Sequence, residues 1–225
     1  MAHNIDLDIV VGTDGVSRCG WAGDAGSSLA QYHDEVWGRQ TSDEDALFEA
    51  LTLGVFQVGL SWKVVFNKRE AFRLAFRGFQ PQKVAELSDA DIDALVQDAA
   101  IIRNRAKIRA TVDNAQAMLA ASPSLPDLLR RFARDPGRAP RRLADLPAYT
   151  PEAEALTKEL KAQGFRYVGP TSVYAFMQNV GMVNDHLQGC FRASSSKPAP
   201  SSRSRPPTSG TSRTARSRSS TVTSV

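Results

Sequence analysis

The sequence predicts an all-α protein. Apolar residues recur at spacings of three and four through most of the chain between residues 42 and 182, which is the pattern of amphipathic helices. No segment shows the alternation of apolar and polar residues that marks a strand. Hydrophobic residues make up 42% of the 225 residues, which is enough for a substantial core. We therefore expect one large helical domain or two joined lobes.

The first helical segment is predicted from Ser42 to Phe79. Ser42 is a candidate N-cap before DEDALFEALTLGVFQVGL, the apolar periodicity continues through SWKVVFNKREAFRLAF, and Gly78 is placed to end the segment. A helical hairpin follows at about 89–119. Ser88 caps its first helix, DADIDALVQ, and the turn DAAIIRNR leads into the amphipathic stretch AKIRATVDNAQAMLA.

The remaining helices are predicted from proline and glycine positions. Between Pro123 and Pro151 the chain is rich in proline and arginine, which favours one short helix within irregular connections. Pro151 suits a first helical turn, and EAEALTKELKAQ continues that helix until Gly164. A last, buried helix is predicted from about Thr171 to Met182.

Composition divides the chain into three parts. We expect a flexible N-terminus at 1–16, a folded domain at 17–192 and a disordered tail at 193–225, because the tail has almost nothing to bury. The net charge of +4 belongs to the tail, since 22 basic and 24 acidic residues remain without it. Such a tail either holds DNA loosely through its phosphates or is a solvated appendage. Its basic residues are Lys197, Arg203, Arg205, Arg213, Arg216 and Arg218.

The N-terminal sequence and the hydropathy exclude two classes of protein. No apolar run approaches the length of a membrane-spanning helix, and MAHNIDLDIV lacks the basic start and apolar stretch of a secretion signal. We therefore expect a soluble, monomeric, cytoplasmic protein with no membrane partner.

Both cysteines and two of the three histidines form a candidate metal site. His186 and Cys190 are four residues apart and would share one face of a helix, and Cys19 and His33 would complete a tetrahedral set. Such a Cys2His2 set leaves no open position and predicts one structural zinc ion. The alternatives are a disulfide, which a cytoplasmic protein rarely forms, and two inert buried thiols. His3 is not expected to take part.

Six strings occur in order along the chain: RCGW, YHDEVWG, QVGLSWKVVFNKREAF, IIRNRAKI, GFRYVGPTSVYAFMQ and GMVNDHLQGC. In order and spacing they resemble the 3-methyladenine DNA glycosylase I family, over residues 19–192. The resemblance implies a helix-hairpin-helix glycosylase fold in which a structural zinc joins the two ends of the domain. It also implies base excision repair in bacteria, on the nucleoid. The reaction would be hydrolysis of the N-glycosidic bond of 3-methyladenine in alkylated double-stranded DNA.

The resemblance assigns the residues that would hold the damaged base. Tyr32 and Trp62 lie at positions that stack on the flipped base, whose positive charge is attracted to aromatic faces. Leu60, after Gly59, matches the position that wedges into the duplex to fill the gap left by that base. Without the resemblance, the two rings and Leu60 would be core or hydrophobic surface, and Gly59 a helix end.

The DNA backbone contacts are assigned to the hairpin turn. The resemblance places this turn at Asp98–Lys107, where backbone amides, that of Ile101 among them, can meet phosphates. Arg103, Arg105 and Lys107 lie nearby in the sequence. On charge alone these three would form a solvated helix face.

Three positions depart from the family pattern. Gly54 stands where most members have the glutamate that reads the hydrogen-bonding edge of the base, and Leu29 where a pocket tyrosine is common. A charge-assisted hydrogen bond is worth about 1.5 to 3 kcal/mol, so losing it would lower affinity or selectivity by roughly one to two powers of ten. Glu49 would point elsewhere on the helix. Ala100 replaces a usual glycine and would be strained if its φ were positive.

No catalytic residue is assigned, because the family lacks the catalytic aspartate of related glycosylases. Asp34 and Asp185, each beside a zinc histidine, are interpreted as outer contacts of the metal site or as surface residues. Three hypotheses follow. The protein is a 3-methyladenine glycosylase with weakened base selection, a glycosylase for another alkylpurine, or a module that binds damage with little cleavage.

Overall fold

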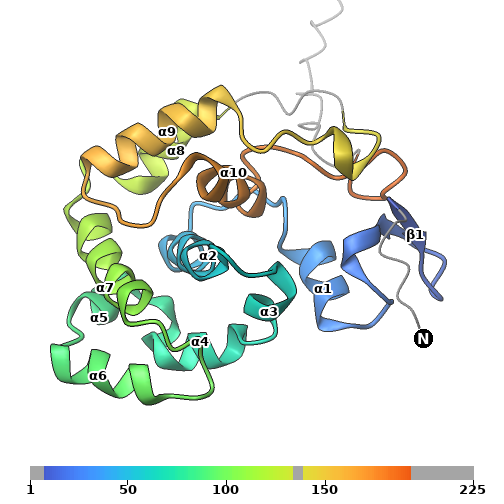
Figure 1. The fold of residues 1–225 in the computed structure, drawn as a ribbon. Helices are drawn as coiled ribbons and strands as arrows, with labels where there is room; N and C mark the ends of the chain where they lie inside the picture. Colours follow the sequence, from blue (N-terminus) through green and yellow to red (C-terminus); the bar gives the residue numbers. More distant parts are fainter. Residues whose placement is uncertain (1–7, 134–138, 194–225) are drawn as a thin grey trace, which may run out of the picture.

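The computed structural model describes residues 8–133 and 139–193, and the regular secondary structure of this part is almost entirely helical, as predicted (Figure 1). The exception is a small antiparallel ribbon in which Val10 lies opposite Arg18. It consists of β1 (Ile9–Val11) and β2 (Ser17–Cys19). The predicted flexible N-terminus, 1–16, therefore extends too far along the chain, because residues 9–11 pair with residues 17–19. The predicted tail, apart from residue 193, lies outside the described residues.

The predicted helices occur in the predicted order along the chain, whereas the helices at Ser28–Glu35 and Pro81–Ala85 were not predicted. Short 3₁₀ turns at Gly20–Ala22, Arg77–Phe79 and Leu143–Asp145 lie between some of them. The α-helices of the described residues are α1 (Ser28–Glu35), α2 (Glu44–Gln57), α3 (Trp62–Phe66), α4 (Arg69–Ala75), α5 (Pro81–Ala85), α6 (Asp89–Gln97), α7 (Arg105–Ala120), α8 (Leu125–Phe132), α9 (Pro151–Ala162) and α10 (Pro170–Asn179).

The long first segment is broken into α2, α3 and α4. Asp43 caps α2 by accepting from the Ala46 amide at 2.8 Å, one residue later than predicted. The break after α2 occurs at Gly59, whose φ of +78° is left-handed and ends a helix. Ser61 then caps α3. Gly78, with φ +72°, ends the segment near the predicted place.

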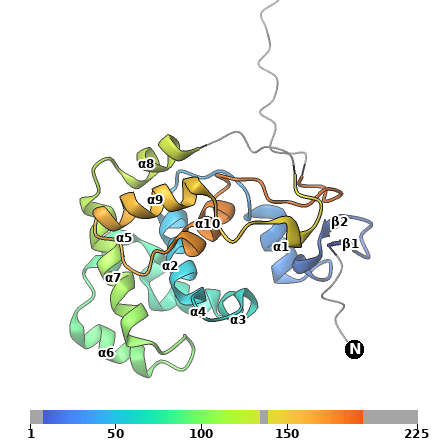
Figure 2. The same ribbon diagram turned by 45° about the horizontal axis from the view of Figure 1, so that its top comes forward.

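The predicted hairpin is present as α6 and α7. Ser88 and Asp91 form a reciprocal capping box at the start of α6. Asn104 caps α7 by accepting from the Lys107 amide at 3.1 Å. The helix α7 packs against both α5 and α6. In two views the hairpin and the β-ribbon lie at opposite ends of the molecule (Figures 1 and 2).

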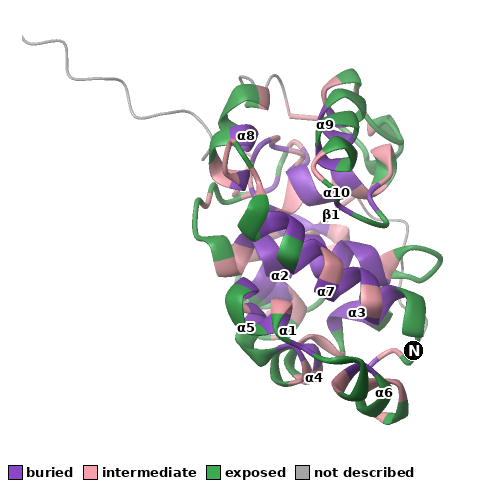
Figure 3. Ribbon diagram, turned by 90° about the vertical axis from the view of Figure 1, so that its left-hand side faces the viewer, coloured by how far each residue is buried: buried purple, intermediate pink, exposed green. Residues whose placement is uncertain are grey.

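The core forms around α2, which is buried along most of its length (Figure 3). A helix that is apolar on nearly all sides belongs in the interior. On one side Phe56 contacts Phe72 of α4, with ring centroids 4.4 Å apart. On another side α2 packs against α10, the predicted last helix, where Val173 and Phe176 are buried. The helix α9 covers α10.

Both ends of the described chain meet beside α1. The Phe191 amide donates to the Ser17 carbonyl at 2.9 Å, and the Gly20 amide donates to the Asp8 carbonyl at the same distance. A small cluster of Cys19, Leu187 and Cys190 is buried here. None of the described helices is long and apolar enough to cross a membrane.

Candidate functional site

The four predicted metal ligands come together in the interior. All are buried, and their ligand atoms lie within 4.8 Å of one another. Cys190 Sγ is 3.5 Å from His33 Nε2 and 3.6 Å from His186 Nδ1, which is 3.8 Å from Cys19 Sγ. Metal bonds of about 2.0 Å to nitrogen and 2.3 Å to sulfur give tetrahedral edges of roughly 3.3 to 3.8 Å. The three distances above match such edges, so the cluster can hold a tetrahedral metal ion. The cysteines are free, so the disulfide alternative is not formed.

The local structure around His186 differs from the prediction. His186 and Cys190 do not share a helix, because α10 ends at Asn179 and this segment is a loop. A turn in which the Cys190 amide donates to the Leu187 carbonyl at 2.9 Å brings the two ligands together. The Leu187 amide also donates to Cys19 Sγ at 3.4 Å. The spacing thus predicted correctly that the His186 and Cys190 side chains meet, but not the backbone structure that brings them together.

Each histidine has one ring nitrogen facing the sulfurs and the other fixed by an oxygen. His33 Nδ1 lies 2.8 Å from Asp34 Oδ1, and His186 Nε2 lies 3.3 Å from the Trp37 carbonyl. A metal-ligating histidine typically donates its second N–H to such an oxygen, which fixes its tautomer. Asp34 therefore lies where an outer contact of a metal site is expected. Asp185 does not, since it accepts hydrogen bonds from Tyr174 and Gln178 of α10.

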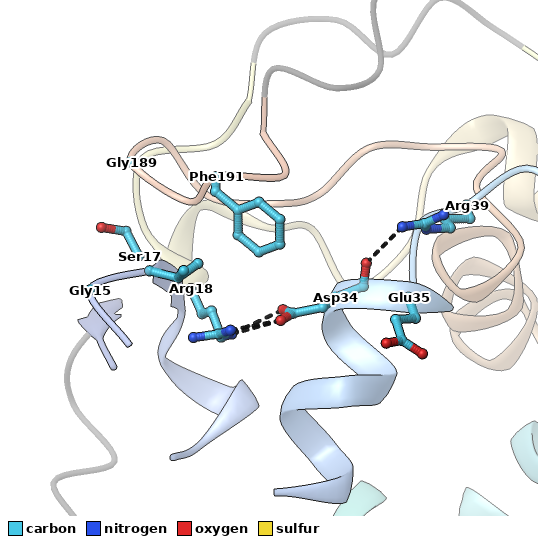
Figure 4. A pocket seen from close by; sticks show the side chains of 9 residues that line it. Gly15, Ser17, Arg18, Asp34, Glu35, Arg39, Gly189 and Phe191 are labelled. Atoms are coloured by element: carbon cyan, nitrogen blue, oxygen red, sulfur yellow. Dashed lines mark hydrogen bonds and ion pairs between the residues drawn. The ribbon is translucent and has the colours of Figure 1, made fainter. Parts of the chain in front are cut away.

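Asp34 is itself held by a buried arginine (Figure 4). The Arg18 guanidinium donates to Asp34 Oδ2 at 2.7 Å and to Asp14 Oδ2 at 2.8 Å, and its Cζ lies 6.0 Å from the centre of the Phe191 ring. Burial opposes ionisation of Asp34, but hydrogen bonds from Arg18 and His33 outweigh it and lower its pKa. The carboxylate that orients His33 is therefore ionised at neutral pH.

The two thiols also interact. Contact with Cys19 lowers the pKa of Cys190, and contacts with the His186 and His33 rings add to the effect against the cost of burial. The same contact, together with burial, raises the pKa of Cys19. The lowered pKa favours the thiolate of Cys190, and a thiolate is the form of cysteine that binds metals.

The two aromatic residues assigned to the base lie in one cluster. The Tyr32 and Trp62 ring centroids are 5.5 Å apart, and Phe66 contacts both rings. A base between them would need a separation of about 7 Å, two layers of van der Waals contact. The rings therefore leave no slot between them. Tyr32 is 6% exposed, whereas Trp62 is half-buried and retains accessible surface.

Tyr32 is fixed on several sides. Its hydroxyl donates to Asn179 Oδ1 at 3.2 Å, and the Arg69 Cζ lies 5.5 Å from its ring centre. Arg69 Nε and Arg73 Nη2 donate to the two oxygens of Glu49 at 2.5 and 2.6 Å. Glu49 is thus fully engaged, which agrees with the expectation that it points elsewhere. The contact of Arg69 with Tyr32 was missed, because nothing in the sequence pairs these residues.

Gly54 is buried in α2 and faces α10. A Cβ atom added there would lie 4.0 Å from the Ser172 carbonyl oxygen, an ordinary van der Waals contact. The backbone packing therefore does not require a glycine at this position. Leu29, the second departure, packs against the aromatic cluster.

Leu60 projects from the loop between α2 and α3, which comprises residues 58–61. Its side chain is 41% exposed, so it is not part of the core. The neighbours Val58 and Val64 are exposed to 45% and 44%. Gly59 supplies the left-handed φ that turns this loop outward. An exposed apolar side chain on a tight loop has the form that a duplex wedge requires.

The hairpin turn, residues 98–104, is exposed at Arg103 and buried at Ile101. Ile101 can therefore meet DNA only through its backbone. Arg103 forms no ion pair with another described residue, whereas Arg105 pairs with Asp93 of α6. Ala100 is not among the described residues with positive φ, so the strain considered for a missing glycine does not arise.

Lys107 does not lie as the sequence suggested. It is 7% exposed, and its Nζ donates to the Phe56 carbonyl at 3.0 Å and to the Val58 carbonyl at 2.6 Å. Its ammonium group is therefore held inside the protein and is not available to a DNA phosphate. Position in the sequence could not distinguish this inward lysine from the exposed Arg103.

Known proteins resemble this chain over nearly all of its described part. The family model described as methyladenine glycosylase matches residues 21–193. The DNA-3-methyladenine glycosylase 1 of Escherichia coli K12 is 40% identical over 81% of this chain and 100% of its own length. The DNA-3-methyladenine glycosylase of Haemophilus influenzae is 41% identical over 77% of this chain and 96% of its own.

Solved structures agree with these sequence matches. A crystal structure of 3-methyladenine DNA glycosylase I has a TM-score of 0.73 and 40% identity, covering 77% of this chain and 98% of that one. The Staphylococcus aureus 3-methyladenine DNA glycosylase I, solved to explain 3-methyladenine recognition, has a TM-score of 0.70 and 33% identity, covering 80% and 96%.

Proposed function

Because this chain belongs to the methyladenine glycosylase family, we propose that it removes 3-methyladenine from alkylated DNA in base excision repair. The reaction is hydrolysis of the N-glycosidic bond, which releases the free base. One observation carries the proposal: the chain aligns with the whole length of a DNA-3-methyladenine glycosylase at 40% identity. The bacterial relatives also support a cytoplasmic place, on the nucleoid when the protein holds DNA.

The reaction requires the protein mainly to hold the base and to admit water. An adenine methylated at a ring nitrogen is a cation and departs as a neutral molecule, so no strong general acid is needed. The half-buried Trp62 ring offers the face on which this cation stacks, with Tyr32 packed behind it. Cation–π attraction supplies up to about 2 kcal/mol when water is excluded. Because Gly54 offers no carboxylate, stacking on Trp62 contributes a larger share of the selectivity for the methylated base.

Two segments hold the duplex in this proposal. Leu60 enters the base stack and fills the gap left by the flipped nucleotide. The hairpin turn presents the backbone amides of residues 101–103 to phosphates, and the exposed Arg103 adds a positive charge. Both segments bind DNA without reading its sequence.

We assign the Cys19, His33, His186 and Cys190 cluster to one structural zinc ion. Its support is the tetrahedral spacing of the ligand atoms and the oxygen contact of each histidine. A closed four-ligand site binds no substrate. Its contribution is to fasten residues 183–193 to the ribbon and α1.

The test is chromatography of the free bases released from methylated DNA by the purified protein. Two variants run alongside it: Gly54→Glu, which adds the carboxylate, and Gly54→Gln, which adds a side chain of the same size without charge. We expect the natural protein to release 3-methyladenine and Gly54→Glu to raise the rate roughly tenfold or more above Gly54→Gln.

The other outcomes separate the alternatives raised by Gly54. Release of a different alkylpurine by the natural protein would mean that its substrate has changed. No release by any of the three proteins, with DNA still bound, would mean that this chain is a damage-binding module. Either result would overturn the proposed reaction.

A further inference from the structure

Two lysines connect the hairpin to the loop that carries Leu60. Lys107, in the first turns of α7, donates to the Phe56 and Val58 carbonyls at the end of α2. Lys68, directly before α4, donates in the opposite direction, to the Ala99 carbonyl at 3.2 Å and the Ala100 carbonyl at 2.7 Å. Each ammonium group thus bridges two carbonyl oxygens of the other segment.

The two lysines are placed where physical chemistry favours a cation. The last carbonyls of a helix have no partner within the helix and form the negative end of its dipole, so the end of α2 attracts Lys107. Charge-assisted hydrogen bonds are the stronger kind, and two of them compensate the burial of this ammonium group. Other cations of the hairpin act locally, since Arg105 and Arg109 pair with Asp93 and Asp89 of α6.

The carbonyl oxygens that the lysines hold lie immediately before the two proposed DNA contacts. Val58 is two residues before Leu60, and only Gly59, with its left-handed φ of +78°, lies between them. Ala100 directly precedes the amides of residues 101–103. Fixing Val58 and Ala100 therefore fixes the distance between the wedge and the phosphate-binding turn.

We propose that Lys68 and Lys107 are positioning residues that set the spacing between Leu60 and the hairpin turn. The inference rests on the proposed function. When the turn grips the backbone of a duplex, Leu60 reaches the base stack only if this spacing is kept. Neither lysine contacts the base. Their loss therefore reduces insertion and base flipping while the exposed Arg103 and the turn amides still bind DNA.

The test uses Lys107→Met and Lys68→Met, which keep most of the side-chain volume and remove the ammonium group. Lys68→Arg restores the donors at the half-exposed position, and Lys161→Met removes a charge from the exposed face of α9 as a control. Base release is measured on a duplex with one 3-methyladenine. Flipping is followed by the fluorescence of 2-aminopurine beside an abasic-site analogue, per bound duplex, so that the folded fraction of each variant cancels.

We expect each methionine variant to lower kcat by about tenfold or more, because small misplacements are costly in rate, with KM changed less than about threefold. The 2-aminopurine signal per bound duplex should fall with kcat, and Lys68→Arg should recover both. Lys161→Met should match the natural protein.

The positioning role is overturned if the 2-aminopurine signal per bound duplex stays at the natural level in both methionine variants. It is also overturned if KM rises while kcat is kept, since the lysines would then serve binding alone. If Lys107→Met does not fold, Lys68→Met decides, because its side chain lies at the surface. Failure of the natural protein to release any base would overturn the proposed function. Base release by the natural protein, with an unchanged 2-aminopurine signal in both methionine variants, would overturn the positioning role alone, so the two failures are distinguishable.

Discussion

Replacing Cys190 by alanine should remove the metal and much of the stability of the domain. The proposed metal site joins segments that are distant in the chain, since His186 follows Cys19 by 167 residues. Treated as a cross-link, the metal closes a loop of this length and raises the free energy of the unfolded chain by about 5 kcal/mol at 25 °C. For a domain of this size, that corresponds to a fall of roughly 10–20 °C in Tm. The figure is an upper limit, because an unfolded chain retains some metal affinity.

The assay combines metal content by mass spectrometry with thermal unfolding, for the natural protein and Cys190→Ala, each before and after a strong chelator. The natural protein should carry about one zinc per chain and lose stability with chelator. The variant should lack zinc and be insensitive to chelator. Comparing the two chelated proteins isolates the cost of the lost thiol packing. A natural protein without metal, or a variant that keeps zinc and an unchanged Tm, would refute the reasoning.

Two further predictions concern the surroundings of the metal and of the base. Asp34→Ala should weaken zinc affinity by about 10- to 100-fold in a chelator competition, because His33 loses the carboxylate that orients it. Asp14→Ala leaves that contact intact and should not change zinc affinity. Equal zinc affinities of the two variants would contradict the role of Asp34. Trp62→Ala should lower kcat/KM for 3-methyladenine release by up to about 30-fold, the equivalent of about 2 kcal/mol of cation–π attraction, while Tyr149→Ala at an exposed position should have no effect. A Trp62→Ala enzyme of natural activity would show that the base does not stack there.

The sequence predicted the helices better than their interruptions. The apolar periodicity was right for α2, α7 and α10, but it continued through residues 58–61, where a single glycine with φ +78° turns the chain. One glycine changes the mean hydropathy of a window very little, although it decides where the helix ends. The paired residues 9–11 were missed for a related reason. A three-residue strand is too short to show alternation.

The direction of side chains is the second feature that the sequence predicted poorly. The spacing of Cys19, His33, His186 and Cys190 predicted that these four side chains meet, because so rare a set of residues seldom forms such a pattern by chance. A lysine offers no such restriction. Lys107 lies beside exposed Arg103 in a basic string, and only the packing of α7 against the end of α2 shows that its charge points inward. A charged residue therefore contacts a surface partner only where packing places no carbonyl or other hydrogen-bonding group within reach of its side chain.

The surroundings of Tyr32 bear on how this chain compensates for Gly54. Phe66, Arg69 and Trp62 contact its ring, and Asn179 holds its hydroxyl, so little of its face is accessible. A cationic base therefore gains most from Trp62. Arg69 would repel that cation if it were alone, but Glu49 neutralises it at 2.5 Å. In this proposal Glu49 acts on the base indirectly, since removing its charge would leave two arginines unpaired beside the aromatic cluster. Glu49 offsets one of these two arginine charges and so lessens the repulsion that a cationic base would meet, although the carboxylate that would read the base is absent.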